Sequence, residues 1–410
     1  MGVPPLSPEF QTAIDMLIES MRQSLGPVTE ARSLPAAMYT SPEFFDFEKR
    51  AIFLKTWLAL GHQNQIPNPG DYFTVEIVDE PLIVIRQPDR SIKVLSAICQ
   101  HRGHPMFHDC AAEQQGNCKT LVCPYHAWTY STDGTLRGAP EMAQTVALAQ
   151  QRADTALPEL RVELFHGFIF ANFDKDAAPL APTLSVADAE LKNYNFADMK
   201  VMPTLFHRNY PWNWKISLEN GLEPYHTSYV HKGFHEVAPA ENAAFTPWED
   251  WREGDNYVTH VTYFEDRRAD AAFNPTGKAQ FPILKNLTEE ERRRTVFSAV
   301  PPTLFFCLLP DQAFTFRIFP RSADSLDLLL NFYYPPETTD LPKFDWMRKV
   351  QISSTETFGE QDELTNKTMQ KAFRSQFAPR GRYSHLESIL PQFNRWLFEK
   401  YSACRAAEKA

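Results

Sequence analysis

Four of the six cysteines and four of the twelve histidines fall within one short stretch, and this cluster constrains the fold more than any other feature. Its members are Cys99, His101, His104, His108, Cys110, Cys118, Cys123 and His126. In a chain with so few cysteines, such clustering indicates metal ligands or redox groups before disulfides. Cys99-x-His101 and Cys123-x-x-His126 each follow a predicted strand, so the chain is expected to bring two ligand-bearing loops to one centre.

Two thiolates and two imidazoles suit either a tetrahedral zinc ion or a Rieske [2Fe–2S] cluster, in which two histidines replace two cysteines on one iron. Structural zinc sites favour Cys-x₂₋₄-Cys and His-x₃₋₅-His pairs. Here each pair contains one residue of each type. The pattern therefore favours the Rieske cluster and leaves zinc as the alternative.

The chain is long enough for more than one domain, since a single hydrophobic core rarely grows past about 250–300 residues. Short β-rich runs at 71–78, 81–87 and 92–98 predict an antiparallel meander around the cysteine cluster. Later strands and a long helix near 346–375 predict an α+β domain. We therefore expect N-terminal helices at 1–48, a small all-β domain at 49–170 and an α+β domain with an antiparallel sheet at 171–410.

A second group of potential ligands begins with the segment that runs from Asn213 to His231. On a continuous helix, Glu219, Glu223 and His226 lie on one face, and His231 lies about 140° round from His226. The helix must then deform or unwind after His226 if both imidazoles are to bind one ion. Two histidines and a carboxylate form the facial triad of non-haem Fe(II) oxygenases.

Two sequence motifs resemble the Rieske signature of the non-haem iron ring-hydroxylating oxygenases, in their catalytic (α) subunit. They are Cys99-Gln-His-Arg-Gly and Cys123-Pro-Tyr-His-Ala-Trp. The resemblance implies that Cys99 and Cys123 hold one iron of the cluster, and that His101 and His126 hold the other. It also implies a helix-grip, START-like catalytic domain. One departure from the family is the longer segment between the two motifs, which contains Cys110 and Cys118. These two residues are two free thiols, a disulfide or a second metal clip.

For the mononuclear iron, the same resemblance implies His226, His231 and Asp362 as ligands, with Glu360 and Glu363 as competitors for the third position. It assigns Glu223 a catalytic role as the acid that bridges this iron to the Rieske histidine of a neighbouring subunit. Most of the family has Asp at this position. Glutamate occurs in a minority that includes monooxygenases of quaternary amines, so this departure weighs against dihydroxylation.

No Gly-x-Gly-x-x-Gly motif follows a strand, so the chain needs a separate reductase, with or without a ferredoxin, to take electrons from NAD(P)H. A net charge of −10 argues against nucleic acid and anionic membranes as partners, and no apolar run reaches the roughly 18–20 residues of a membrane span. We expect a cytoplasmic homotrimer, with a β subunit as a further possibility implied by the family.

The resulting functional prediction is a terminal oxygenase that uses O₂ to hydroxylate a small organic substrate, with an aromatic or heteroaromatic acid slightly favoured. The alternative is a monooxygenase or N-demethylase of a quaternary or N-methylated amine, since aromatic side chains can also cage a cation. The alternative from another class is a non-catalytic electron carrier or a zinc-stabilised binding protein. The intact second ligand set weighs against that alternative.

Overall fold

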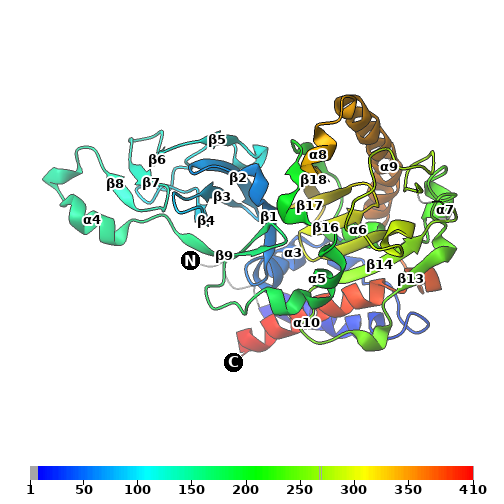
Figure 1. Ribbon diagram of the computed structural model, residues 1–410. Coiled ribbons are helices and arrows are strands. Elements are labelled where there is room, and N and C mark those ends of the chain that lie inside the picture. The colour runs from blue at the N-terminus through cyan, green and yellow to red at the C-terminus, as the bar shows by residue number, and fades with distance from the viewer. Residues whose placement is uncertain (1–7, 267, 269, 410) are drawn as a thin grey trace. The chain divides into compact units, whose positions relative to one another are not determined.

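The computed structural model describes residues 8–266, 268 and 270–409 and divides the chain into two compact units (Figure 1). One unit contains residues 55–178, and the other combines residues 8–54 with 179–409. The expected boundaries at 49 and 171 differ from this division, and the N-terminal helices belong to the larger unit. The reason is packing, because the π-helical turn Lys49–Phe53 contacts the last helix, α10 (Leu390–Lys409).

The smaller unit is built from two antiparallel sheets. The larger sheet has the order β1-β10-β9-β4-β3-β2-β5, in which the expected meander is confirmed as β2, β3 and β4. Its strands are β1 (Leu58–His62), β2 (Asp71–Ile77), β3 (Glu80–Arg86), β4 (Ile92–Ser96), β5 (Gln115–Asn117), β9 (Glu159–Phe165) and β10 (Phe168–Asn172). The smaller sheet contains β6 (Thr120–Val122), β7 (Thr129–Ser131) and β8 (Leu136–Gly138), and one helix follows it, α4 (Leu148–Asp154).

The larger unit is built around a curled antiparallel sheet in the order β11-β18-β17-β16-β15-β14-β13, and β12 also pairs with β18. The strands are β11 (Lys200–Val201), β12 (Leu205–Tyr210), β13 (Ala243–Phe245), β14 (Val258–Tyr263), β15 (Arg294–Val300), β16 (Leu304–Leu308), β17 (Ala313–Ser322) and β18 (Ser325–Tyr334). The helices are α1 (Pro8–Ser20), α2 (Ala37–Thr40), α3 (Pro42–Glu48), α5 (Ser185–Leu191), α6 (Trp214–Leu222), α7 (Thr227–Val230), α8 (Pro336–Thr339), α9 (Phe344–Ala372) and α10. The α+β fold class is confirmed.

Helix α6 lies against this sheet and is fixed at both ends. At its start the Asn213 side chain accepts a hydrogen bond from the Lys215 N–H at 3.0 Å, and the Asn213 N–H donates to Gln370 of α9 at 3.0 Å. Near its end Gly221 faces Phe305, and a Cβ there would come within 2.9 Å of the ring. The cap and the glycine together set how closely α6 approaches α9 and the sheet.

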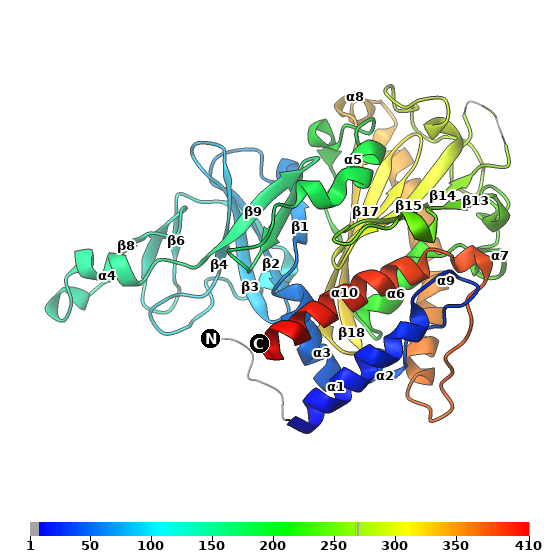
Figure 2. The ribbon, with the colours of Figure 1, turned by 90° about the horizontal axis from the view of Figure 1, so that it is seen from below.

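A buried ion pair connects α6 to both ends of the chain. Glu48 Oε1 lies 2.7 Å from Lys215 Nζ, and both side chains are 0% exposed. Glu48 also accepts hydrogen bonds from Tyr401 of α10 and from the Trp214 indole, at 2.5 and 3.2 Å. Figure 2 shows α1 and α10 side by side in the same unit. The terminal helices are therefore part of the framework that positions α6.

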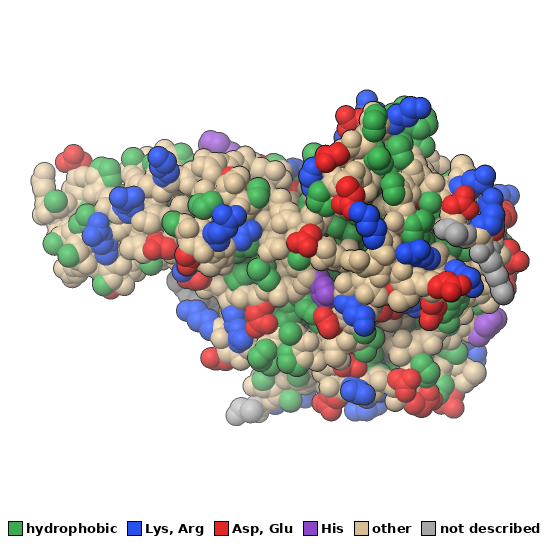
Figure 3. All heavy atoms as spheres, viewed as in Figure 1, with side chains coloured by type: hydrophobic (Ala, Val, Ile, Leu, Met, Phe, Trp, Pro, Cys, Tyr) green, Lys and Arg blue, Asp and Glu red, His purple; other side chains and the backbone are tan. Residues whose placement is uncertain are grey.

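Charged side chains of both signs are interspersed over the face of the molecule drawn in Figure 3. Over the whole sequence the acidic residues outnumber the basic ones, 51 to 41. Within the described residues, every helix is too short or too polar to cross a lipid bilayer.

Candidate metal centres

The two Cys/His loops of the smaller unit have the same backbone conformation. In each loop the cysteine N–H donates to the carbonyl five residues later, at 2.9 Å for Cys99 and 2.8 Å for Cys123. Each cysteine carbonyl accepts from the N–H four residues later, at 3.0 Å in both cases. That fourth residue is left-handed, with φ of 73° at Gly103 and 57° at Ala127. Gly103 adopts this left-handed conformation without steric strain, whereas Ala127 adopts it at an energetic cost.

The loops place two thiols inside the domain and two imidazoles toward its surface. Cys99 and Cys123 are each only 2% exposed, whereas His101 is partly exposed and His126 is exposed. The rings of His101 and His126 lie with centroids 4.8 Å apart. This donor set fits a [2Fe–2S] cluster whose inner iron is bound by the cysteines and whose outer iron is bound by the histidines.

Two aromatic residues of the same region support these loops. The Tyr130 hydroxyl accepts the Gln100 N–H at 3.1 Å, which leaves its own proton to donate to Cys99 Sγ at 3.4 Å. His101 stacks on Trp128 with centroids 4.6 Å apart and planes 6° apart. Hydrogen bonds to the sulfur ligands adjust the potential of such clusters. Sequence reasoning did not single out Tyr130, because its contact with Cys99 joins residues that are 31 positions apart in the chain.

The inserted segment between the motifs adds a strand to the larger sheet. Among the residues described, Cys110 and Cys118 are both free thiols, the first buried and the second partly buried. Their segment continues into β5, which pairs with β2. The interpretation of the pair as two free thiols is therefore confirmed, and the disulfide alternative is wrong.

In the larger unit, α6 ends earlier than the sequence analysis predicted. The helix stops at Leu222, and Glu223 has an extended backbone with φ of −109° and ψ of 132°. The cause is Pro224, because a proline disfavours helical geometry in the residue before it. His226 and His231 then flank the short helix α7 as its N-cap and C-cap residues. The helical face shared by Glu219, Glu223 and His226 does not form, and the helix breaks before His226.

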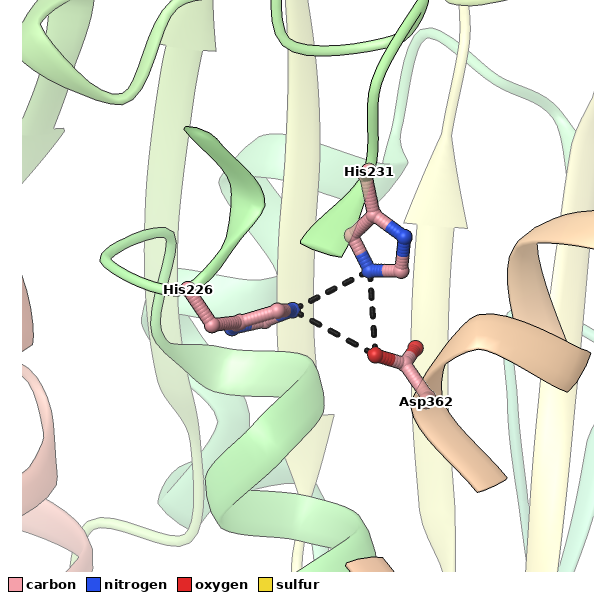
Figure 4. Close-up of side chains that lie close together, drawn as sticks. All are labelled: His226, His231 and Asp362. Carbon is pink, nitrogen blue, oxygen red and sulfur yellow. Dashed lines mark hydrogen bonds and ion pairs between the residues drawn. The ribbon is translucent and has the colours of Figure 1, made fainter. Parts of the chain in front are cut away.

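Three side chains converge where this segment meets α9 (Figure 4). His226 Nε2 lies 3.1 Å from His231 Nε2, and Asp362 Oδ1 lies 3.5 Å from the first nitrogen and 3.0 Å from the second. Three ligands on one face of an octahedral ion, each at about 2.1 Å, are separated from each other by about 3.0 Å. In the described part of the chain these residues form the one group of three or more His, Cys, Asp or Glu whose ligand atoms lie close enough together to share a single ion.

The hydrogen bonds around this group show which atoms are available to a metal. His226 Nδ1 lies 2.6 Å from Glu223 Oε1, and His231 Nδ1 lies 2.8 Å from Gln361 Oε1. Both partners are acceptors, so each imidazole carries its proton on Nδ1 and directs the lone pair of Nε2 toward Asp362. Two lone pairs and a carboxylate oxygen that face each other repel unless positive charge, from a proton or a metal ion, lies between them. The residues therefore fit a metal ion.

The electrostatics of the group also favour positive charge. Burial works against protonation of His226, but the Glu223 and Asp362 carboxylates outweigh it and raise the pKa of this histidine. Asn220 donates to Asp362 Oδ1 at 3.2 Å, and its amide nitrogen lies 3.5 Å from His226 Nε2. Asn220 thus helps to hold two of the converging side chains.

The two acids of α9 that competed with Asp362 for the third ligand position lie outside the group of converging side chains. Glu360 is exposed, whereas Glu363 is partly buried and lines the neighbouring cavity. Gln361, which lies between Glu360 and Asp362, was not among the predicted site residues, and no local pattern distinguishes it.

A cavity of ≈ 140 Å³ opens beside the three side chains. It has room for about ten waters or for one small organic molecule. Aromatic rings dominate its lining, including Tyr210, Trp212, Phe297, Phe305, Phe316 and Phe358. The acids on its wall are Glu223, Asp362 and Glu363, and the described lining residues include no lysine or arginine.

Comparisons with known proteins agree with both centres. Residues 56–158 match the Rieske [2Fe–2S] domain, and residues 191–403 match the ring hydroxylating alpha subunit (catalytic domain). The chain therefore belongs to the ring-hydroxylating alpha subunits, as the sequence motifs indicated. Its cofactors are those of this family, a Rieske [2Fe–2S] cluster and a mononuclear non-haem iron.

Individual relatives include both monooxygenases and dioxygenases. The carnitine monooxygenase oxygenase subunit of Acinetobacter pittii is 31% identical over 229 residues, which cover 54% of this chain and 58% of the relative. The benzene 1,2-dioxygenase subunit alpha of Pseudomonas putida is 34% identical over 193 residues, which cover 46% of this chain and 42% of the relative. The chain thus spans little more than half the length of the first relative.

Two solved structures show the same fold over nearly the whole chain. A quaternary ammonium Rieske monooxygenase has a TM-score of 0.73 at 22% identity, covering 98% of this chain and 100% of that one. Naphthalene 1,2-dioxygenase from Rhodococcus sp. has a TM-score of 0.76 at 20% identity, covering 98% and 99%.

Proposed function

We propose that this chain is the terminal oxygenase of a multicomponent system and that its substrate is a small quaternary or N-methylated amine. When bound, the cluster supplies single electrons and the mononuclear iron supplies O₂ activation. The observation that carries the choice of substrate is the cavity wall beside His226, His231 and Asp362. That wall combines aromatic rings with carboxylates and has no basic side chain among its described residues.

This wall favours an amine over the aromatic acid that the sequence analysis slightly preferred. A carboxylate that leaves water needs a cation or several donors to offset the loss of hydration. Here the wall acid that is assigned neither to the metal group nor to the contact with His226 is Glu363, and it would repel a carboxylate. The similarity to carnitine monooxygenase oxygenase subunits supports the same choice.

Tyr210 and Trp212 form the part of the wall best suited to a substrate cation. Their rings stack with centroids 4.4 Å apart. The pKa of Tyr210 is raised to about 12, chiefly by burial and further by the negative charges of Glu363, Glu360 and Glu356. An ammonium group over such rings gains about 0.5–2 kcal/mol from the cation–π interaction, and the acids nearby add to the attraction.

We further propose that His226, His231 and Asp362 hold the mononuclear iron, and that Cys99, His101, Cys123 and His126 hold the cluster. In this proposal electrons arrive from a separate reductase. Glu223 lies 2.6 Å from His226 Nδ1, with a side chain that is 13% exposed, so part of the carboxylate can be reached from outside. We assign to it a hydrogen bond with His126 of the partner subunit.

The exposed position of His126 supports this assembly. Val122 and Tyr125, beside it, are 50% and 52% exposed, and apolar surface of this kind is suited to docking. A homotrimer would supply the two halves of the path from different subunits, and a β subunit could accompany it.

A single-turnover experiment tests the proposed substrate. The iron-loaded protein is reduced chemically in the presence of one compound, exposed to O₂, and its product is identified by mass spectrometry. We expect oxidation of butyltrimethylammonium and no oxidation of benzoate. Glu363→Gln should weaken binding of the amine, whereas Glu360→Gln, on the exposed side of α9, should change it less. Oxidation of benzoate without oxidation of the amine would contradict the proposal.

A further inference from the structure

Strand β14 presents two polar side chains to the cavity that are not needed to hold the metal. His260 and Thr262 are two residues apart, so they lie on the same face of the strand, and both line the cavity. Each is 2% exposed. Thr259, between Val258 and His260, faces the opposite side and donates to Glu190 at 3.0 Å.

These two side chains lack hydrogen-bond partners within the described protein. No atom of the described residues meets the distance and angle of a hydrogen bond to either ring nitrogen of His260 or to Thr262 Oγ1, although the Leu222 carbonyl lies near the imidazole. Most buried polar groups in folded proteins have a partner, and leaving one without a partner is costly. Because His260 and Thr262 face the cavity, we expect their partners to come from the molecule that fills it.

The surroundings of His260 keep its imidazole neutral. Phe245 and Phe297, its cross-strand neighbours, have ring centroids 5.6 and 5.4 Å from it. Burial lowers the pKa of His260 to about 3, and the carbonyl of Leu222 opposes this only in part. A neutral imidazole offers one N–H donor and one lone pair. It therefore suits an uncharged polar group and cannot offset the charge of a carboxylate.

We propose that His260 and Thr262 form a subsite that recognises a hydroxyl group of the substrate. A hydroxyl both donates and accepts, so one such group can bond to the imidazole and to the threonine oxygen. The Glu363 carboxylate and the aromatic rings of the cavity wall would hold the cationic end. The substrate class is then an N-methylated amine that carries a hydroxyl group. The amine part of this assignment rests on the proposed function, whereas the hydroxyl part does not.

Binding of matched probes tests this subsite without turnover. The full chain, loaded with cluster and iron and kept free of oxygen, is titrated calorimetrically with (3-hydroxypropyl)trimethylammonium and with butyltrimethylammonium. The two differ by a hydroxyl in place of a methyl. A neutral pair, 2-phenylethanol and propylbenzene, makes the same comparison without a charge. In whichever pair binds, we expect the hydroxylated compound to bind roughly three- to tenfold more tightly than its apolar counterpart.

Two variants assign the preference to the proposed residues. His260→Phe keeps an aromatic ring between Phe245 and Phe297, and Thr262→Val keeps the shape of the side chain. Each should lower the preference for the hydroxylated probe and leave the affinity for its apolar counterpart within about twofold. Thr259→Val, on the opposite face of the strand, is the matched control and should leave the preference unchanged.

The outcomes separate the subsite from the proposed function. Equal affinities within each pair, or a preference that survives in both variants, would overturn the subsite. If the neutral pair binds more tightly than the cations and still shows a preference that depends on His260, the subsite stands and the amine assignment fails. If the cations bind more tightly without a hydroxyl preference, the amine assignment stands and the subsite fails.

Discussion

Glu223 Oε1 lies 2.6 Å from Nδ1 of His226, and this contact directs the opposite nitrogen of the ring toward Asp362 and His231. Glu223 also accepts the backbone N–H of His226 at 3.1 Å. One carboxylate thus holds both the backbone and the ring of a proposed ligand. Because Pro224 ends α6 at this point, Glu223 is free of the helix and can turn back onto the histidine.

Replacing Glu223 with glutamine should leave both metal centres filled and reduce turnover. The amide keeps the size of the side chain but removes the charge that stabilises the His226 ring and the proposed bridge to the partner subunit. We expect a loss of about ten- to a hundredfold in turnover, with iron content unchanged. Metal analysis and the rate of product formation measure the two quantities. A fully active variant would disprove the bridging role.

Asp362→Ala should remove the mononuclear iron and spare the cluster. The carboxylate is the one anionic member of the group, so its loss leaves two imidazoles that bind a divalent ion weakly. We expect iron to fall from about three to about two per chain, with two acid-labile sulfides and the red-brown spectrum retained. Glu360→Ala and Glu363→Ala are the controls, and loss of iron in either of them would reassign the third ligand.

Glu48→Ala should destabilise the larger unit strongly. The variant leaves the Lys215 ammonium buried without its partner and removes the acceptor of Tyr401 and Trp214. Breaking a buried pair of this kind costs about 3–5 kcal/mol. Denaturant unfolding measures the loss, and pairing Glu48→Leu with Lys215→Met should recover much of it. The exposed pair of Glu19 and Arg22 is the control, in which Glu19→Ala should have little effect.

Asp311 should make stability depend on pH in the mildly acidic range. Its side chain is buried and accepts the N–H groups of Gln280 and Phe281 at 2.9 and 3.2 Å, and burial raises the pKa of its carboxyl to about 6. Between pH 4 and pH 6 the folded state therefore binds more protons than the unfolded state. The contribution of Asp311 to the free energy of unfolding should fall by up to about 3 kcal/mol as the pH rises through this window and stay level above it. Burial raises the pKa values of Glu219 and Glu387 to about 7, so these two carboxyls add a slope of the same sign that extends to higher pH.

Asp311→Asn should remove the contribution of Asp311 and make the slope shallower, because the amide does not ionise, whereas the slope from Glu219 and Glu387 should remain. Denaturant titrations at several pH values measure it, with the exposed Asp345→Asn as a control that keeps the slope. The assignment would be contradicted if the stability of the wild-type protein rose between pH 4 and pH 6 and if Asp311→Asn abolished that rise.

The sequence alone determined the local parts of both centres. Each cysteine and histidine of the Rieske motifs is separated from its partner by one or two residues, so a single loop presents both. His226 and His231 are similarly close in the chain. Short β-rich runs likewise predicted the strands around the first centre. These features depend on neighbours in sequence, which backbone geometry relates directly.

The tertiary structure decided which distant groups meet. Only the packing of α9 against α6 brings Asp362, and neither Glu360 nor Glu363, to the two histidines, with Gln361 behind His231. The break at Pro224 replaced the helix face that periodicity predicted. The polarity of the cavity, including the unpartnered His260, depends on strands and helices far apart in the chain. Such long-range contacts leave no local pattern, because they arise from the burial and complementarity of surfaces that only the folded chain forms.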